Sequence, residues 1–153
     1  MRPLVLLLLS SLFACGDEET ACTEMGCGLD TETARLTLSE PAGGWAAEQE
    51  VQYRIFLTYD GDTQTCAGTP ASGLWCDGED TSVENSDVGE GERVVALTAI
   101  LLNAFPETLD LVIERDGVDV VTQGFEIEPA VSYPNGPSCA PECRTWSGTV
   151  DSW

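Results

Sequence analysis

The sequence predicts an all-β fold, an antiparallel β-sandwich of immunoglobulin-like or transthyretin-like character with about eight short, disulfide-stabilised strands. Several segments alternate apolar and polar residues with a period of two, which is the pattern of half-buried strands. Asp-Gly dipeptides at residues 60–61 and 116–117 join such segments, and this dipeptide favours tight hairpin turns. Helical periodicity is rare by comparison.

The first half of the chain holds four expected strands. The clearest spans residues 51–59, where large apolar residues from Val51 to Tyr59 occupy alternate positions. Asp60-Gly61 supplies residues that tolerate a tight turn, so the chain is expected to return as a partner strand. The four expected strands are residues 33–39, 51–59, 63–67 and 74–76.

Residues 77–92 differ in composition from the rest of the chain. They contain seven acids and no basic residue. Like charges this close repel one another, and such runs are usually solvated. The sequence therefore predicts one long exposed loop here.

Four more strands are expected in the second half. Residues 93–102 fit either a buried strand or a short helix, and their β-branched content favours the strand. Residues 109–114 and 118–123 form a predicted hairpin around Asp116-Gly117, and Phe125 and Ile127 extend its second strand. Prolines interrupt the pattern until a last short strand at residues 146–150.

The N-terminus predicts export. An apolar run from Pro3 to Phe13 is too short to span a bilayer and is typical of a signal-peptide core. The pattern Leu12-Phe13-Ala14-Cys15 resembles the lipobox of bacterial lipoproteins, which implies cleavage after Ala14 and lipid on the Cys15 thiol. The alternative is an ordinary secretory signal that leaves Cys15 as a free thiol. The large Leu12 disfavours it, because such sites have a small residue at that position.

Three parts of the chain are expected from this pattern: a signal peptide at residues 1–14, a lipidated acidic tether at 15–21, and a single β-sandwich domain at 22–153. The mature length is that of one typical domain.

The cysteine count is consistent with lipidation. The chain has seven cysteines, so assigning Cys15 to lipid leaves an even set that can close three disulfides. Cys66 and Cys76 flank a short excursion and are expected to pair. The other four lie near the two ends, and bonds that join the ends are preferred, although their pairing stays open: Cys22, Cys27, Cys139 and Cys143. A zinc–thiolate site is disfavoured because an oxidising compartment promotes disulfides and the chain has no histidine.

The charge of the chain limits its partners. The formal net charge is −21, and the chain contains neither lysine nor histidine. Such a surface repels nucleic acid, whose binding requires Lys and Arg. It also repels anionic lipid headgroups, so any membrane attachment is expected through acyl chains on Cys15.

The residue types also argue against catalysis. Without histidine or lysine, the chain cannot form Ser-His-Asp, Cys-His or Ser-Lys arrangements, and it has no Gly-x-Ser-x-Gly elbow or phosphate-binding glycine loop. A carboxylate-based hydrolase remains as a third choice. The expectation is no enzyme, no catalytic residue and no cofactor.

Acidic loops suggest a calcium-dependent adhesion or ligand-binding module as an alternative. Asp60 and Asp62, and Asp77 and Asp80, are weak calcium candidates that do not match the EF-hand loop. Solvated acidic loops are the preferred interpretation, so no metal site is expected.

The tryptophans allow a sugar-binding platform as a further interpretation. Packing in the core or over a disulfide is favoured for Trp45, Trp75 and Trp146, whereas Trp153 at the chain end is expected to be exposed.

The segment from Pro134 to Arg144 reads Pro-Asn-Gly-Pro-Ser-Cys-Ala-Pro-Glu-Cys-Arg. It resembles the ending of a group of small uncharacterised bacterial lipoproteins. The resemblance implies a β-sandwich and an envelope location and brings no activity with it. Together these observations predict a monomeric, non-catalytic binding or structural module, anchored by lipid in the bacterial cell envelope at the outer membrane. The sequence does not identify its protein or glycan partner.

Overall fold

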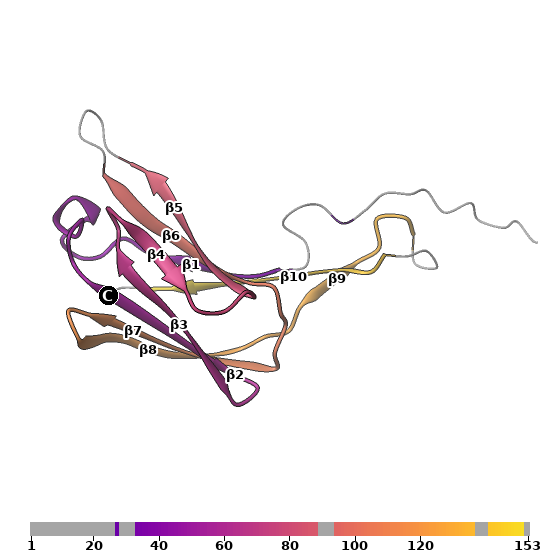
Figure 1. Cartoon of the computed structure of the whole chain (residues 1–153). Helices are drawn as coiled ribbons and strands as arrows, with labels where there is room; N and C mark the ends of the chain where they lie inside the picture. Colours follow the sequence, from indigo (N-terminus) through magenta and orange to yellow (C-terminus); the bar gives the residue numbers. More distant parts are fainter. Residues whose placement is uncertain (1–26, 28–32, 89–93, 137–140, 152–153) are drawn as a thin grey trace, which may run out of the picture.

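The computed structural model describes residues 27, 33–88, 94–136 and 141–151. Within them, ten strands form two five-stranded sheets that face each other (Figure 1). The strands are β1 (Thr33–Leu38), β2 (Tyr53–Tyr59), β3 (Asp62–Thr69), β4 (Gly73–Cys76), β5 (Thr81–Asp87), β6 (Val95–Leu102), β7 (Thr108–Arg115), β8 (Val118–Glu126), β9 (Ala130–Ser132) and β10 (Cys143–Val150). One 3-10 turn, η1 (Trp45–Ala47), lies between β1 and β2. The predicted sandwich is confirmed.

The first sheet has the order β5-β6-β1-β10-β9. The first and last long strands of the domain, β1 and β10, lie side by side and run parallel, while the other pairs in this sheet are antiparallel. Beyond β1, the Ser39 amide and hydroxyl both donate hydrogen bonds to the Val150 carbonyl, at 3.2 and 2.8 Å. The two ends of the domain are therefore joined within one sheet.

The second sheet has the order β4-β3-β2-β7-β8 and is antiparallel throughout. Both predicted Asp-Gly hairpins are confirmed. Asp60 and Gly61 have φ values of 52° and 85°, and Asp116 and Gly117 have 51° and 80°. Positive φ at both central residues is the requirement of the type I′ turn, whose twist matches that of the strands.

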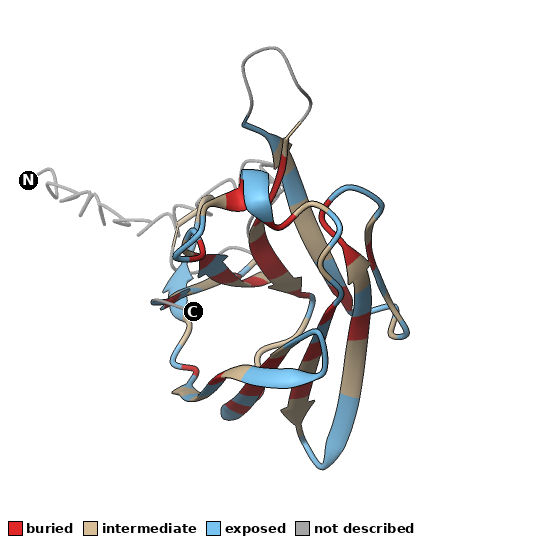
Figure 2. Cartoon of the chain, turned by 90° about the vertical axis from the view of Figure 1, so that its left-hand side faces the viewer, coloured by how far each residue is buried: buried red, intermediate tan, exposed pale blue. Residues whose placement is uncertain are grey.

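The core lies between the sheets. Buried residues alternate with more exposed ones along most strands (Figure 2). This is the expected result of period-two patterning, because successive side chains point to opposite faces. The fully buried side chains include Leu36 of β1, Tyr53, Ile55 and Leu57 of β2, Ile100 of β6, and Leu109, Leu111 and Ile113 of β7.

The expectation of one exposed loop over residues 77–92 is wrong for residues 81–87. These form the edge strand β5, paired with β6. Thr81 is buried and Val83 packs against the core, so this strand has an apolar face despite its acids. Glu84 accepts a hydrogen bond from Arg35 Nη2 at 2.6 Å, which supplies the missing counter-charge. Residues 89–93 lie outside the described part.

Two further differences concern the C-terminal region. The three-residue strand β9 was not predicted, and β10 begins at Cys143 rather than at Trp146. Strand β9 pairs with the additional first residues of β10: Cys143 lies opposite Ser132, and Thr145 lies opposite Ala130. A strand this short has no measurable period, so its pairing partner alone defines it.

Two disulfides lie within the described residues. Cys66 and Cys76 face each other on β3 and β4 and are bonded, as predicted. Cys27 is bonded to Cys143 at the start of β10, which confirms a bond between the two ends of the domain. Cys22 and Cys139 lie outside the described residues.

Candidate binding surface

The outer face of the second sheet carries an unexpected line of apolar residues. On β2, the buried Tyr53, Ile55 and Leu57 face the core, so Arg54 and Phe56 face outward. The register places Trp75 of β4 opposite Ala67 of β3, and Phe56 of β2 opposite Val112 of β7 two positions further along the strands. We name these four outward residues, Trp75, Ala67, Phe56 and Val112, the apolar strip.

Trp75 is the most exposed large hydrophobic side chain of the described residues, at 80%. The expectation that it packs in the core or over the disulfide is wrong. Cys76 faces Cys66 to form their bond, and neighbouring residues of a strand point to opposite faces. A tryptophan next to this cysteine in sequence must therefore face away from the core.

Phe56 and Val112 are half-buried, and neither belongs to the hydrophobic side chains packed against the core. They lie directly opposite each other on β2 and β7. Phe56 is the diagonal neighbour of Ala67, so apolar outward residues occur on four adjacent strands. Contiguous apolar surface of this kind is commonly used for interaction with another molecule.

Polar groups flank the strip on both sides. On one side, Arg54 Nη1 lies 3.8 Å from Glu114 Oε2, which is too long for a hydrogen bond. On the other side, the Thr58 and Thr63 hydroxyls are hydrogen-bonded at 2.9 Å, and Asp110 is exposed opposite Thr58.

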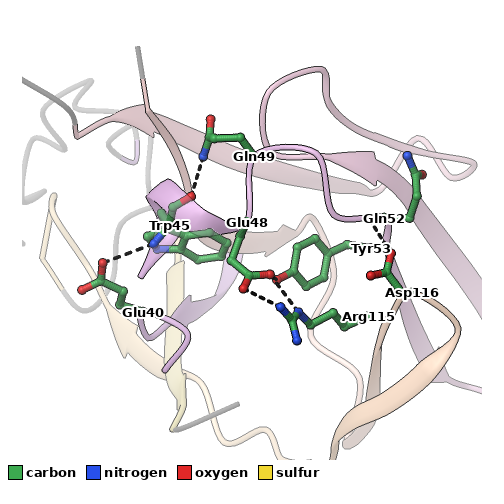
Figure 3. Close-up of polar contacts among 8 residues, drawn as sticks. All are labelled: Glu40, Trp45, Glu48, Gln49, Gln52, Tyr53, Arg115 and Asp116. Carbon is green, nitrogen blue, oxygen red and sulfur yellow. Dashed lines mark hydrogen bonds and ion pairs between the residues drawn. The ribbon is translucent and has the colours of Figure 1, made fainter. Parts of the chain in front are cut away.

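A hollow of about 490 Å³ opens beside Ala67 of the strip. Arg54 and Ala67 form part of its lining, together with Gln52 and the Asp116-Gly117 turn. Two hydrogen bonds hold the rim. The backbone N–H of Gln52 donates to Asp116 Oδ1 at 3.1 Å (Figure 3), and the backbone N–H of Asp116 donates to the backbone carbonyl of Gln52 at 2.8 Å. The hollow is within the size range of small-ligand sites.

A buried carboxylate cluster lies between the sheets near this hollow (Figure 3). Glu48 follows η1 and is 3% exposed. Arg115 donates to it through Nε at 2.8 Å and Nη2 at 2.7 Å, and the Tyr53 hydroxyl donates at 2.7 Å. The next residue, Gln49, exchanges side-chain hydrogen bonds at 2.9 Å with both backbone groups of Val95 on β6. The η1 turn thus connects both sheets.

The cluster keeps Glu48 ionised. Burial raises the pKa of its carboxyl, but the hydrogen bonds from Arg115 and Tyr53 and the Arg115 charge outweigh burial, so the pKa lies below its usual value. The pKa of Tyr53 is raised by burial and by its bond to Glu48. Both Glu48 oxygens are occupied by donors, and a lowered pKa is poorly matched to proton transfer near neutral pH. This geometry serves packing and orientation.

The weak calcium candidates are not gathered by the fold. Asp60 and Asp62 are at a hairpin tip, and Asp77 Oδ1 accepts a hydrogen bond from the Thr65 amide at 2.7 Å. Among the described residues, no three His, Cys, Asp or Glu side chains are grouped so as to hold a metal ion.

We therefore expect millimolar Ca²⁺ to stabilise the protein by less than about 1 kcal/mol, because a ligand stabilises the folded state substantially only when its concentration is well above its Kd for that state. Thermal unfolding with and without Ca²⁺ measures this, with Mg²⁺ as a control for screening. A stabilisation of several kcal/mol that Asp77→Asn with Asp80→Asn abolishes would instead support a calcium-dependent module.

The other predicted positions have varied outcomes. Trp45 is buried, with its ring edge-to-face against Tyr53 at 6.4 Å, and Trp146 packs against the core and edge-to-face with Phe125 at 5.8 Å. Their predicted packing is confirmed. Trp153, Cys15 and the whole Leu12–Cys15 pattern lie outside the described residues. Within the described residues, no helix has the length and apolarity to cross a bilayer.

The sequence contained one signal for the apolar strip. In the alternating segment from residue 51 to 59, the outward positions are Gln52, Arg54, Phe56 and Thr58, and Phe56 is the aromatic exception among polar residues. No family model, curated protein or solved structure matches this chain.

Proposed function

We propose that this chain is a lipid-anchored, non-catalytic binding module of the bacterial cell envelope, located at the outer membrane. Its anchor is Cys15, and its binding surface is the apolar strip on the outer face of the second sheet. The observation that carries the binding role is the exposed Trp75 ring on the same outer sheet face as Phe56 and Val112.

The anchor rests on the Leu12–Cys15 pattern and on the position of Cys27 in the fold. Cys27 lies twelve positions after Cys15 and is bonded to Cys143 on β10. A fully extended chain of that length reaches at most about 40 Å, so the domain stays near the membrane surface. Two or more acyl chains give stable anchoring, whereas one chain gives marginal binding.

The binding role rests on the chemistry of Trp75 and its neighbours. Tryptophan and arginine are the residue types most often found at the energetic centre of interfaces. A tryptophan that is left in water loses the stabilisation that its large apolar surface would gain on burial. The outer face of the second sheet places such a ring opposite Ala67, and Ala67 and Arg54 line the adjoining hollow, a suitable arrangement for recognition.

Replacing Cys15→Ser should release the protein from membranes or block its processing, because the acyl chains provide the attachment. Membrane flotation of cell fractions and mass spectrometry of the N-terminus measure this. Ser11→Ala is the matched control, since it changes the signal segment and leaves Leu12–Cys15 intact. Recovery of the wild-type chain as soluble protein with a free Cys15 thiol would contradict the anchor.

A further inference from the structure

We propose that the apolar strip binds an extended, basic segment of a partner polypeptide, with an arginine or lysine of that segment against the Trp75 ring. This inference rests on the proposed binding function and names the class of partner. It follows from the dimensions of the strip, the charges that flank it and the residue types that form it.

The dimensions suit a short extended segment. The strip crosses from β4 through β3 and β2 to β7, and neighbouring strands lie about 4.8 Å apart, so its length is about 14 Å. An extended polypeptide advances about 3.3 Å per residue, so four or five residues cover it. Side chains of such a segment alternate in direction, and every second one faces the sheet.

The charges select a cationic partner. Asp110 and Glu114 flank Val112 on the outward face of β7, and Asp119 lies opposite Glu114 on β8. The whole chain carries a formal charge of −21, which attracts cations over a long range and accelerates their association. The same charge repels a second copy of this chain and any anionic ligand.

Arg54, which lies beside the strip opposite Ala67, makes a long ion pair. Arg54 is 65% exposed at its side chain, and its ion pair with Glu114 is long at 3.8 Å. Glu114 Oε2 is buried and, among the described residues, accepts no hydrogen bond. A guanidinium or ammonium group that approaches from the partner can therefore compete for Glu114 as Arg54 swings outward.

Trp75 provides the second contact for a cation. The face of an indole ring attracts guanidinium and ammonium groups more strongly than other aromatic rings do. The neighbouring Ala67 is small, so it leaves room beside the ring for a long side chain. Phe56 and Val112 then accept the apolar residues of the segment.

A neutral oligosaccharide fits this surface less well. A sugar platform needs flat rings that face solvent together, and here Phe56 is half-buried while Ala67 and Val112 are not aromatic. A neutral ligand also gains nothing from the charge of the chain. The polypeptide is therefore the partner that the strip favours.

The test uses the full mature chain in mild detergent and two synthetic peptides of eight residues, one alternating Arg and Leu and the other Gln and Leu. Isothermal titration should detect binding of the arginine peptide that weakens as salt is raised. Trp75→Ala should weaken it about tenfold or more, the effect expected of a central interface residue. Asp110→Asn should weaken it less and reduce its salt dependence.

Tyr133→Ala is the matched control, because Tyr133 is an exposed aromatic residue just beyond β9 of the other sheet, and it should change affinity by less than about twofold. Thermal unfolding checks that each variant folds. Val112→Thr replaces one methyl group by a hydroxyl, so it lowers the apolarity of the strip while its shape stays nearly unchanged, and it should also weaken binding of the arginine peptide.

Four results would overturn the inference. Equal effects of Trp75→Ala and Tyr133→Ala would show that the arginine peptide does not bind specifically at the strip. Trp75-dependent binding of a tetramer of N-acetylglucosamine, with no binding of the arginine peptide, would identify a saccharide site and leave the proposed binding function standing. Trp75-dependent dimers in sedimentation would identify a second copy as the occupant. If neither peptide nor saccharide bound and no dimer formed, the strip would not be a binding surface, and the proposed function would fail as well.

Discussion

Replacing all four terminal cysteines by serine should lower the free energy of unfolding by about 4–5 kcal/mol, against about 3 kcal/mol for Cys66→Ser with Cys76→Ser. A disulfide restricts the unfolded chain more when it closes a longer loop. The Cys27–Cys143 bond spans 116 residues of sequence and the Cys66–Cys76 bond spans 10. Since domains usually have about 5–15 kcal/mol of stability, the first variant should be close to unfolded.

Urea unfolding of both variants under non-reducing conditions measures the difference. The double variant Cys27→Ser with Cys143→Ser tests whether a second disulfide also joins the two ends. If Cys22 and Cys139 also bond, as the even cysteine count predicts, they keep the ends joined and this pair loses much less than the four-cysteine variant. Equal stability of the four-cysteine and the Cys66/Cys76 variants would contradict the role of the terminal clip. Thiol labelling of the native, non-reduced protein should find no free cysteine.

Glu48→Ala should destabilise the fold by about 2–3 kcal/mol, because it removes the three charge-assisted hydrogen bonds that the buried Glu48 carboxylate accepts from Arg115 and Tyr53. The lower end of the range for a broken buried ion pair applies, since the Arg115 side chain is 45% exposed and can turn to water. Chemical unfolding measures the loss. Tyr53→Phe is the milder companion, since it removes one hydrogen bond and keeps the ring.

The stabilisation that Glu48 gives to the folded state should decrease at acid pH. Its folded-state pKa lies below the ordinary value of 4.5, so the folded state favours the ionised form. The stabilisation is fully present above pH 4.5 and is lost as the pH falls through the folded pKa. The difference in stability between wild type and Glu48→Gln should therefore shrink on acidification below that value. A difference that grows at acid pH would contradict the ionised cluster.

Local sequence patterns predicted most of the fold. Both Asp-Gly hairpins are set by turn residues and by alternation over seven or more residues, which are local signals. Strand β5 is not evident from the sequence because its acids mask the inward positions of Thr81 and Val83, and because its counter-charge, Arg35, lies 49 residues away in sequence. Such a partner can be seen only once the sheet is formed.

The candidate site depends on register, which the sequence does not show. Phe56 was visible as an exception on a polar face, but its neighbours Val112 and Ala67 come from other strands. The adjoining cysteine favours a packed position for Trp75, but the strand geometry that forms the disulfide turns the ring outward. The Glu48 cluster likewise needs Arg115, 67 residues away in sequence.

The most direct test of the proposed binding surface is hydroxyl-radical labelling of the protein in isolated envelope membranes, where the proposed anchor would hold it, and again in detergent. The radicals modify exposed aromatic side chains, so they report which face is covered where the protein resides. We expect Trp75 and Phe56 to be labelled less in the membranes than in detergent, with Tyr133 on the other sheet labelled equally in both. Equal labelling of Trp75 in the two states, or protection of Tyr133 alone, would contradict a binding role for the outer face of the second sheet.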